Sequence, residues 1–222
     1  MASTRRLAAI LATDVAGYSR LMGADEEGTH ERLQAHRREL VAPKIGEHSG
    51  RVVKNTGDGM LAEFPSVVAA VRCAVKLQRA MIGREAAMPE NCRIRFRIGI
   101  NLGDIIVEDD DIFGDGVNVA ARLEALAEPG GICISRMVRD RIRDRLPYAF
   151  EDFGEQSVKN IARRVRVYAL RAKPSPTHWD HVRRLRRFRS QLRRGWQSSC
   201  CRFPTSAATR SSNILRTRSP RI

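Results

Sequence analysis

The sequence predicts an α/β (α+β) fold with a ferredoxin-like βαββαβ core that further strands and helices extend. Three patterns lead to this prediction. Residues 7–14 are almost continuously apolar and have the length of a strand that is buried on both faces. Residues 93–100 place Ile94, Phe96, Ile98 and Ile100 on one face and Arg93, Arg95 and Arg97 on the other, which is typical of a half-buried strand. Between them, residues 65–83 have the apolar spacing of a helix.

The remaining elements follow in order along the chain. Residues 17–48 are expected to be helical, and the strands 51–56 and 59–64 flank Gly57-Asp58-Gly59, a tight hairpin because Asp-Gly tolerates positive φ angles. Pro65 opens the helix 65–83, whose expected inner face holds Val68, Val71, Val75 and Ile82. Further elements are expected as strand 104–108, helix 115–127, strand 132–135, helix 136–143, and strands 149–153 and 165–170.

The charge of the chain is unevenly distributed. Of its formal net charge of +15, residues 173–222 supply +12, from 13 Lys or Arg and one Asp, which leaves +3 for residues 1–172. We therefore predict a globular domain over 1–172 and a basic tail over 173–222. Two interpretations of the tail stay open: an arginine-rich arm for nucleic acid or anionic membrane, or a disordered remnant of a longer region. We favour the disordered remnant, and expect no specific nucleic-acid partner.

The composition also bears on where in the cell the protein is expected. The sequence contains no run of about 18 apolar residues, so we expect no membrane span and a cytoplasmic protein. Its five cysteines include no CxxC pairs, which argues against a disulfide framework and against a zinc site.

Two aspartates are candidates for a metal site. Asp14 ends the first strand and Asp58 lies at the hairpin tip, and a sheet of this order could bring them side by side. Mg²⁺ is commonly held by one or two carboxylates together with substrate phosphates. The alternatives are a helix cap for Asp14 and simple turn formation for Asp58.

The helix 115–127 carries a second candidate pair. Asn118 and Arg122 are four residues apart and share one helix face, where an amide and a guanidinium suit a ribose or a phosphate. Val119, Leu123 and Leu126 are expected to form the core stripe beside them. The alternative is a solvated polar face.

Five motifs together resemble a known family. Over residues 1–171 the chain is similar to the catalytic domain of class III adenylate and guanylate cyclases, of the bacterial adenylate cyclase type, and the fold expected is therefore the class III nucleotide cyclase fold. The motifs are Thr13-Asp-Val-Ala-Gly-Tyr-Ser19, Lys54-Asn-Thr-Gly-Asp-Gly59, Ile98-Gly-Ile-Asn-Leu-Gly103, Asp111-Ile-Phe-Gly-Asp-Gly-Val-Asn-Val-Ala-Ala-Arg122 and Val158-Lys-Asn-Ile161.

The resemblance implies a two-metal mechanism. Asp14, Asp58 and the backbone carbonyl of Val15 would hold two divalent cations, Mg²⁺ or Mn²⁺, that activate the ribose 3′-hydroxyl and hold the triphosphate. By the same resemblance, Asn118 orients the ribose and Arg122 stabilises the transferring phosphoryl group. Lys159 matches the family's triphosphate-contacting lysine.

The base-reading positions of the family correspond to Lys54 and Asp111. Lys54 can donate to adenine N1 and Asp111 can accept from the 6-amino group, whereas the guanine 6-oxygen would be repelled by Asp111. The sequence therefore favours ATP, although Asp110 stands where many relatives have an aromatic residue. The alternatives are a guanylate cyclase and a catalytically silent nucleotide-binding module.

The family assembles each site across a dimer. We therefore expect a homodimer with shared sites, in which Lys54 and Asp58 serve opposite active sites.

Overall fold

The computed structural model describes residues 4–109, 111–157 and 164–171, which lie within one compact unit, Met1–Lys173. The predicted tail, 173–222, and the predicted triphosphate ligand Lys159 lie outside the described residues.

One sheet organises the described part of the chain. Its order is β2-β3-β1-β4-β6-β8-β7, and β5 pairs with β4 outside this path. The first four strands in the chain are antiparallel neighbours in the order β2-β3-β1-β4, with helices after β1 and after β3, so the ferredoxin-like core is confirmed. The strands are β1 (Thr4–Val15), β2 (Arg51–Thr56), β3 (Gly59–Phe64), β4 (Phe96–Glu108), β5 (Asp111–Phe113), β6 (Ile132–Ser135), β7 (Ala149–Gln156) and β8 (Val165–Arg171).

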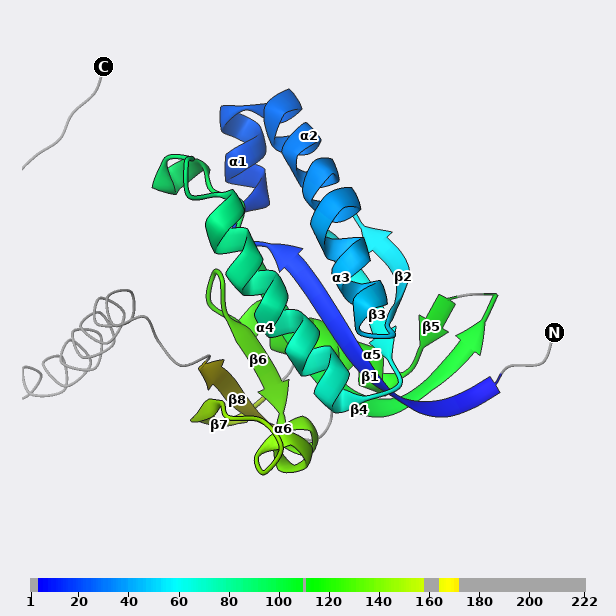
Figure 1. Cartoon of the computed structure of the whole chain (residues 1–222). Helices are drawn as coiled ribbons and strands as arrows, with labels where there is room; N and C mark the ends of the chain where they lie inside the picture. The colour runs from blue at the N-terminus through cyan, green and yellow to red at the C-terminus, as the bar shows by residue number, and fades with distance from the viewer. Residues whose placement is uncertain (1–3, 110, 158–163, 172–222) are drawn as a thin grey trace, which may run out of the picture. The chain divides into compact units, whose positions relative to one another are not determined.

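The helices cover the sheet unequally (Figure 1). Ala9 and Leu11 of β1 pack with residues of α2, α3, α4 and α6, whereas Ala8 and Ile10 point the other way and pack with Ala120 of α5. One face therefore carries most helices, and the opposite face carries α5. The helices are α1 (Tyr18–Ala24), α2 (Glu26–His36), the π-helix η1 (Arg37–Val41), α3 (Ala42–Glu47), α4 (Val67–Arg84), the 3₁₀ helix η2 (Glu90–Cys92), α5 (Asp115–Leu126) and α6 (Arg136–Ile142).

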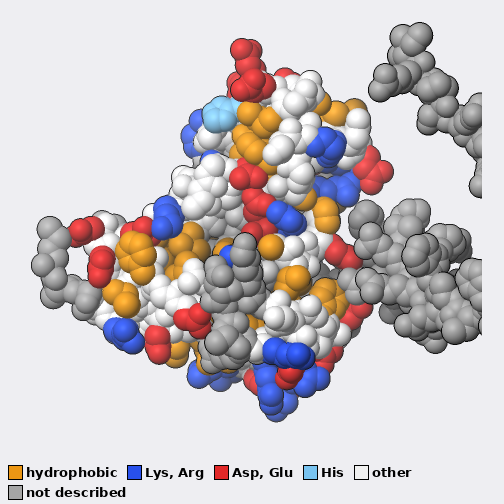
Figure 2. Space-filling model, turned by 180° about the vertical axis from the view of Figure 1, so that it is seen from behind, with side chains coloured by type: hydrophobic (Ala, Val, Ile, Leu, Met, Phe, Trp, Pro, Cys, Tyr) orange, Lys and Arg blue, Asp and Glu red, His pale blue; other side chains and the backbone are white. Residues whose placement is uncertain are grey.

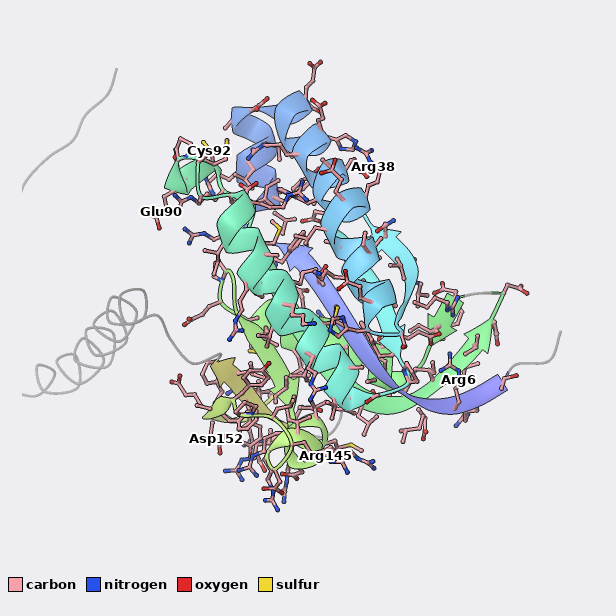
Figure 3. All side chains as sticks on the ribbon, viewed as in Figure 1. Arg6, Arg38, Glu90, Cys92, Arg145 and Asp152 are labelled. Atoms are coloured by element: carbon pink, nitrogen blue, oxygen red, sulfur yellow. The ribbon has the colours of Figure 1, made fainter. Side chains whose placement is uncertain are left out.

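Labelled side chains mark the extent of this unit (Figure 3). Arg6 lies near the start of β1, Glu90 and Cys92 lie beyond the end of α4, and Arg145 and Asp152 lie by α6 and β7. In this part of the chain no helix has both the length and the apolar character needed to cross a membrane.

The structure corrects the prediction of two separate strands over 93–100 and 104–108. Residues Phe96–Glu108 form one continuous strand, β4. It pairs with β1 from Thr4↔Val107 to Val15↔Phe96, so the neighbouring strand satisfies the backbone through the predicted break.

Two residues predicted for the core are exposed. Ile82 is 74% exposed and Leu126 is 40% exposed, so both predictions were wrong. Met81 takes the inner position of α4 instead, and Ala127 is buried just after α5, whereas Val119 and Leu123 are buried as predicted. Successive residues are about 100° apart around a helix axis. A residue at the edge of the predicted apolar face can therefore point into solvent.

Two glycines fix the shape around the α5 face. Gly57 has φ +62° as the first residue of the two-residue turn between Thr56 and Gly59, so the positive φ falls on Gly57 rather than on Asp58. A Cβ at Gly99 would lie 2.2 Å from the carbonyl oxygen of Ala120, so α5 lies directly on β4. Gly57 thus allows the tight turn, and Gly99 allows α5 to approach β4 closely.

Candidate active site

Asp14 and Asp58 come together at one end of β1. The pairing of Thr13 with Met60 sets the end of β1 beside the hairpin turn that carries Asp58. The pKa of Asp58 is raised, first by burial and then by a hydrogen bond with Asp14 and by the charge of Asp14. The two carboxylates therefore crowd each other in one place.

This donor set fits a hard divalent cation. Two neighbouring carboxylates carry like charges that repel each other, and a cation between them offsets this repulsion. The described residues contain no group of three or more His, Cys, Asp or Glu side chains able to hold a metal. Two carboxylates completed by a backbone carbonyl, for which Val15 is the candidate, and by substrate phosphates are the pattern usual for Mg²⁺.

Arg97 joins this pair, and sequence reasoning did not single it out as functional. Its Nη2 donates a hydrogen bond to Asp14 Oδ2, and its Nε lies 3.2 Å from Glu124 Oε1. The pKa of Glu124 is raised to about 7 by burial first and by the charge of Asp14 next, while Arg97 lowers it and Asp58 raises it. Arg97 belongs to the arginine face of the predicted strand 93–100, but only the β1–β4 register shows that this face meets Asp14.

Arg37 holds the turn that carries Asp58. Its Nη2 donates to the carbonyl oxygens of Gly57 at 2.6 Å and Gly59 at 2.8 Å. Burial lowers the pKa of Arg37, while Tyr18 and Asp58 act in the opposite direction. Arg37 opens the π-helix η1, and such irregular turns often occur at functional sites.

Lys54 and Asp111 form a second pair on the same face. Lys54 Nζ lies 2.7 Å from Asp111 Oδ2 and 5.4 Å from the centroid of the Phe113 ring. The hydrogen bond from Lys54 is the main reason that the pKa of Asp111 is lowered, and the Ile112 N–H also donates to this carboxylate. The β2–β3 register shifts between Val52 and Lys54, and Lys54 then pairs with Leu61, which packs toward the α5 side.

Asn118 and Arg122 project from the outer side of α5. Both are exposed, while Val119, Ala120 and Leu123 of the same helix are buried. Arg122 and Glu124 are two residues apart, about 200° around the helix, so they lie on opposite sides of its buried stripe. Among the contacts of the described residues, no hydrogen bond or ion pair joins Arg122 to Asp14 or Asp58.

Figure 2 looks onto the face that carries α5. Acidic and basic side chains gather across its middle, with hydrophobic side chains around them. Phe113 and Leu126 are the exposed large hydrophobic residues of β5 and α5. This face therefore offers a ligand charged groups with hydrophobic side chains around them.

The family follows from sequence comparison. A model of the adenylate and guanylate cyclase catalytic domain matches residues 4–172, so the chain belongs to this family. A protein of Rhizobium meliloti (strain 1021), named "Putative adenylate cyclase 3", is 54% identical over 164 residues, which are 74% of this chain and 28% of that protein. The chain thus spans less than a third of that relative's length.

Solved structures agree with the fold. A structure titled as an adenylate/guanylate cyclase/hydrolase from Silicibacter pomeroyi has 54% identity and a TM-score of 0.73, covering 77% of this chain and 99% of that one. The adenylyl cyclase CyaB from P. aeruginosa, at 24% identity, has a TM-score of 0.68 and covers 79% and 98%. The class III cyclase fold and the family expected from the five motifs are confirmed.

Proposed function

We propose that the chain is an adenylate cyclase that converts ATP to 3′,5′-cyclic AMP and pyrophosphate. The observation that carries the proposal is the presence of two charged pairs, Asp14 with Asp58 and Lys54 with Asp111, on the face that carries α5. The first pair suits a metal-bound triphosphate and the second suits an adenine.

The reaction forms one bond and breaks one. The ribose 3′-oxygen attacks the α-phosphorus, the bond from that phosphorus to the pyrophosphate oxygen breaks, and the hydroxyl proton passes to solvent. Asp14, Asp58 and the carbonyl of Val15 would hold two divalent cations. When bound, such cations lower the pKa of the 3′-hydroxyl and neutralise the departing pyrophosphate.

Two residues of α5 are proposed to serve the other half of this reaction. Asn118 can orient the ribose through its amide, and Arg122 can donate to the phosphoryl oxygens as negative charge moves onto them. Both are exposed and so are available to a nucleotide. Lys159 is proposed to contact the triphosphate.

Lys54 and Asp111 are proposed to select the base. Lys54 and Asp111 bond to each other in the structure, so an adenine must exchange their mutual bond for bonds to N1 and to the 6-amino group. Guanine offers an oxygen where Asp111 needs a donor, and leaving a carboxylate facing an acceptor costs about 1–3 kcal/mol.

The two half-sites are proposed to meet across a homodimer. Arg122 lies on the side of α5 away from Glu124, and Glu124 is the residue that contacts the Asp14 cluster through Arg97. A nucleotide at Asp14 would therefore take its Arg122 from a second copy of the chain. We propose that this dimer works in the cytoplasm, where ATP is abundant.

Product analysis tests the proposal. The full chain is incubated with ATP or GTP and Mg²⁺ or Mn²⁺, and Asp58→Asn serves as the blank because it keeps the turn and removes a charged ligand. Cyclic AMP from ATP, absent in the blank, is the expected result. Cyclic GMP as the main product would indicate a guanylate cyclase, and no cyclic product from a folded dimer would favour the silent nucleotide-binding module.

A further inference from the structure

Arg97 stands between two carboxylates that belong to different parts of the site. On one side its Nη2 donates to Asp14, a proposed metal ligand, and on the other its Nε approaches Glu124 of α5. The side chains of Asp14, Arg97 and Glu124 are 19%, 28% and 13% exposed, so water screens these charges only in part. A cation on Asp14 and the guanidinium of Arg97 therefore compete for the same carboxylate.

The contact with Glu124 is incomplete. Arg97 Nε and Glu124 Oε1 are 3.2 Å apart, yet both atoms are buried and neither has a hydrogen-bond partner among the described residues. Buried polar atoms without partners are uncommon and costly. A small movement of Arg97 away from Asp14 would align these two atoms and satisfy both.

We propose that Arg97 is a built-in counter-cation of Asp14, and that a divalent cation displaces it onto Glu124. In the metal-free chain Arg97 neutralises part of the crowded Asp14–Asp58 pair. When a cation takes its place, Arg97 completes its hydrogen bond to Glu124. Glu124 thus acts as a positioning residue that receives Arg97 and lowers the cost of metal binding. This inference rests on Asp14 being a metal ligand, as proposed above.

The displacement would also connect the two half-sites of one chain. Glu124 lies two residues beyond Arg122 on α5, and α5 lies directly on β4, the strand that carries Arg97. A stronger bond between Arg97 and Glu124 would therefore tie α5 to β4 when metal is bound. In a shared-site dimer, the metal occupancy of one site would thereby influence the helix that serves the other.

Binding of Mn²⁺ alone, without nucleotide, tests the proposal. Affinity is measured by electron paramagnetic resonance of free Mn²⁺ on the full chain at about pH 8, above the pKa of about 7 to which burial raises Glu124. Arg97→Gln removes the competitor and should tighten Mn²⁺ binding about tenfold, the effect of losing one charge-assisted hydrogen bond. Glu124→Gln removes the negative charge that receives the displaced guanidinium and should weaken binding several-fold.

The double variant separates the proposal from a general effect of charge. If Glu124 acts through Arg97, then Glu124→Gln should have no further effect in the Arg97→Gln background. Additive effects would overturn the proposal, because they would mean that both residues act only through the local electric field. Arg95→Gln, which changes the same charge two residues away at an arginine paired with Glu90, is the matched control and should alter affinity less than about twofold.

The remaining outcomes are also decisive. Arg97→Met provides a second uncharged variant if Arg97→Gln is unstable in thermal unfolding. In one outcome, the wild type binds Mn²⁺, Asp14→Asn abolishes this binding, and both Arg97 variants keep the wild-type affinity. That outcome would overturn this inference and leave the proposed metal site intact. Absence of Mn²⁺ binding by the folded wild type would overturn both.

Discussion

Lys54 Nζ lies 2.7 Å from Asp111 Oδ2, although the two residues are 57 positions apart. One lies on β2 just after a register shift, and the other opens β5. Neither residue would be notable alone, since a lysine and an aspartate on a surface usually face water. Their pairing makes a donor and an acceptor available at one place, which is what recognition of an adenine edge needs.

This pairing predicts the base preference of the proposed cyclase. The double variant Lys54→Glu, Asp111→Cys lacks the donor to adenine N1 and the acceptor for the adenine 6-amino group. The ratio of kcat/KM for ATP to that for GTP should fall by about 10–100-fold, as expected for one or two lost hydrogen bonds. Asp109→Asn, in the same acidic run, is the control and should leave the ratio unchanged. A double variant with the wild-type ratio would mean that the base is read elsewhere.

We expect Arg37 to support metal binding by holding the turn that carries Asp58. Because Arg37 donates to Gly57 and Gly59, Arg37→Gln should loosen the turn that carries Asp58 and weaken Mn²⁺ binding and kcat/KM by on the order of tenfold. Arg38→Gln is the matched control, since the Arg38 side chain is 75% exposed and extends outward from the helix (Figure 3). Equal effects of the two variants on metal affinity would show that Arg37 contributes charge alone.

The contact of α5 with β4 predicts that alanine substitutions at two glycines have very different effects on stability. Gly99→Ala places a Cβ 2.2 Å from backbone atoms of Ala120 and Glu124, so it should lower the free energy of unfolding by about 3 kcal/mol. Gly83→Ala, in α4 with nothing within 4 Å of the added Cβ, should raise it by up to about 1 kcal/mol. Urea unfolding midpoints measure both. A tolerated Gly99→Ala would contradict the close packing of this helix.

A buried carboxylate predicts a loss of stability in acid. Glu85 lies 2.7 Å from His36 Nε2 and accepts from the Ile94 N–H at 2.9 Å. Burial alone raises the pKa of Glu85, but these hydrogen bonds and the charges of His36 and Arg32 outweigh it and lower the pKa. A lowered folded-state pKa stabilises the fold above the usual carboxyl value of about 4.5, and this contribution is lost as the pH falls through the folded pKa.

Glu85→Gln should therefore cost on the order of 2 kcal/mol at pH 7, and the difference from the wild type should narrow as the pH falls below about 4.5. Urea unfolding at several pH values gives this difference directly. Glu47→Gln, at an exposed carboxylate paired with Lys44, should leave the free energy of unfolding nearly unchanged at any pH, because water screens this pair. A constant difference for Glu85→Gln across this range would contradict the assigned pKa direction.

Much of the fold could be predicted because its patterns are local. The alternation over 93–100 and the apolar run over 7–14 report burial directly, and the apolar face of Ile94, Phe96, Ile98 and Ile100 is buried as expected. The continuity of β4 could not be predicted, since it depends on pairing with β1 along its whole length. The π-helix at Arg37 likewise leaves no pattern in the sequence.

Sequence motifs mark part of the candidate site, and the roles of the residues in those motifs stay predictions. Asp14, Asp58, Asn118 and Arg122 stand in recognisable motifs, but the residues that surround them do not. The place of Arg97 beside Asp14 is known only from the β1–β4 register. The place of Arg37 is known only from its hydrogen bond to Gly57, 20 residues along the chain. Positions of this kind depend on tertiary structure, because their roles are set by what faces them rather than by their neighbours in sequence.

The most direct test of the central claim is complementation between two inactive variants. Asp58→Asn removes the metal half and Arg122→Ala removes the phosphate half, so each homodimer should lose cyclase activity. When equal amounts are mixed and allowed to exchange subunits, half of the dimers are mixed and each holds one intact site. We predict recovery of cyclic AMP synthesis to about a quarter of the wild-type rate. No recovery, from variants shown to exchange subunits, would contradict a cyclase whose active sites are shared between two chains.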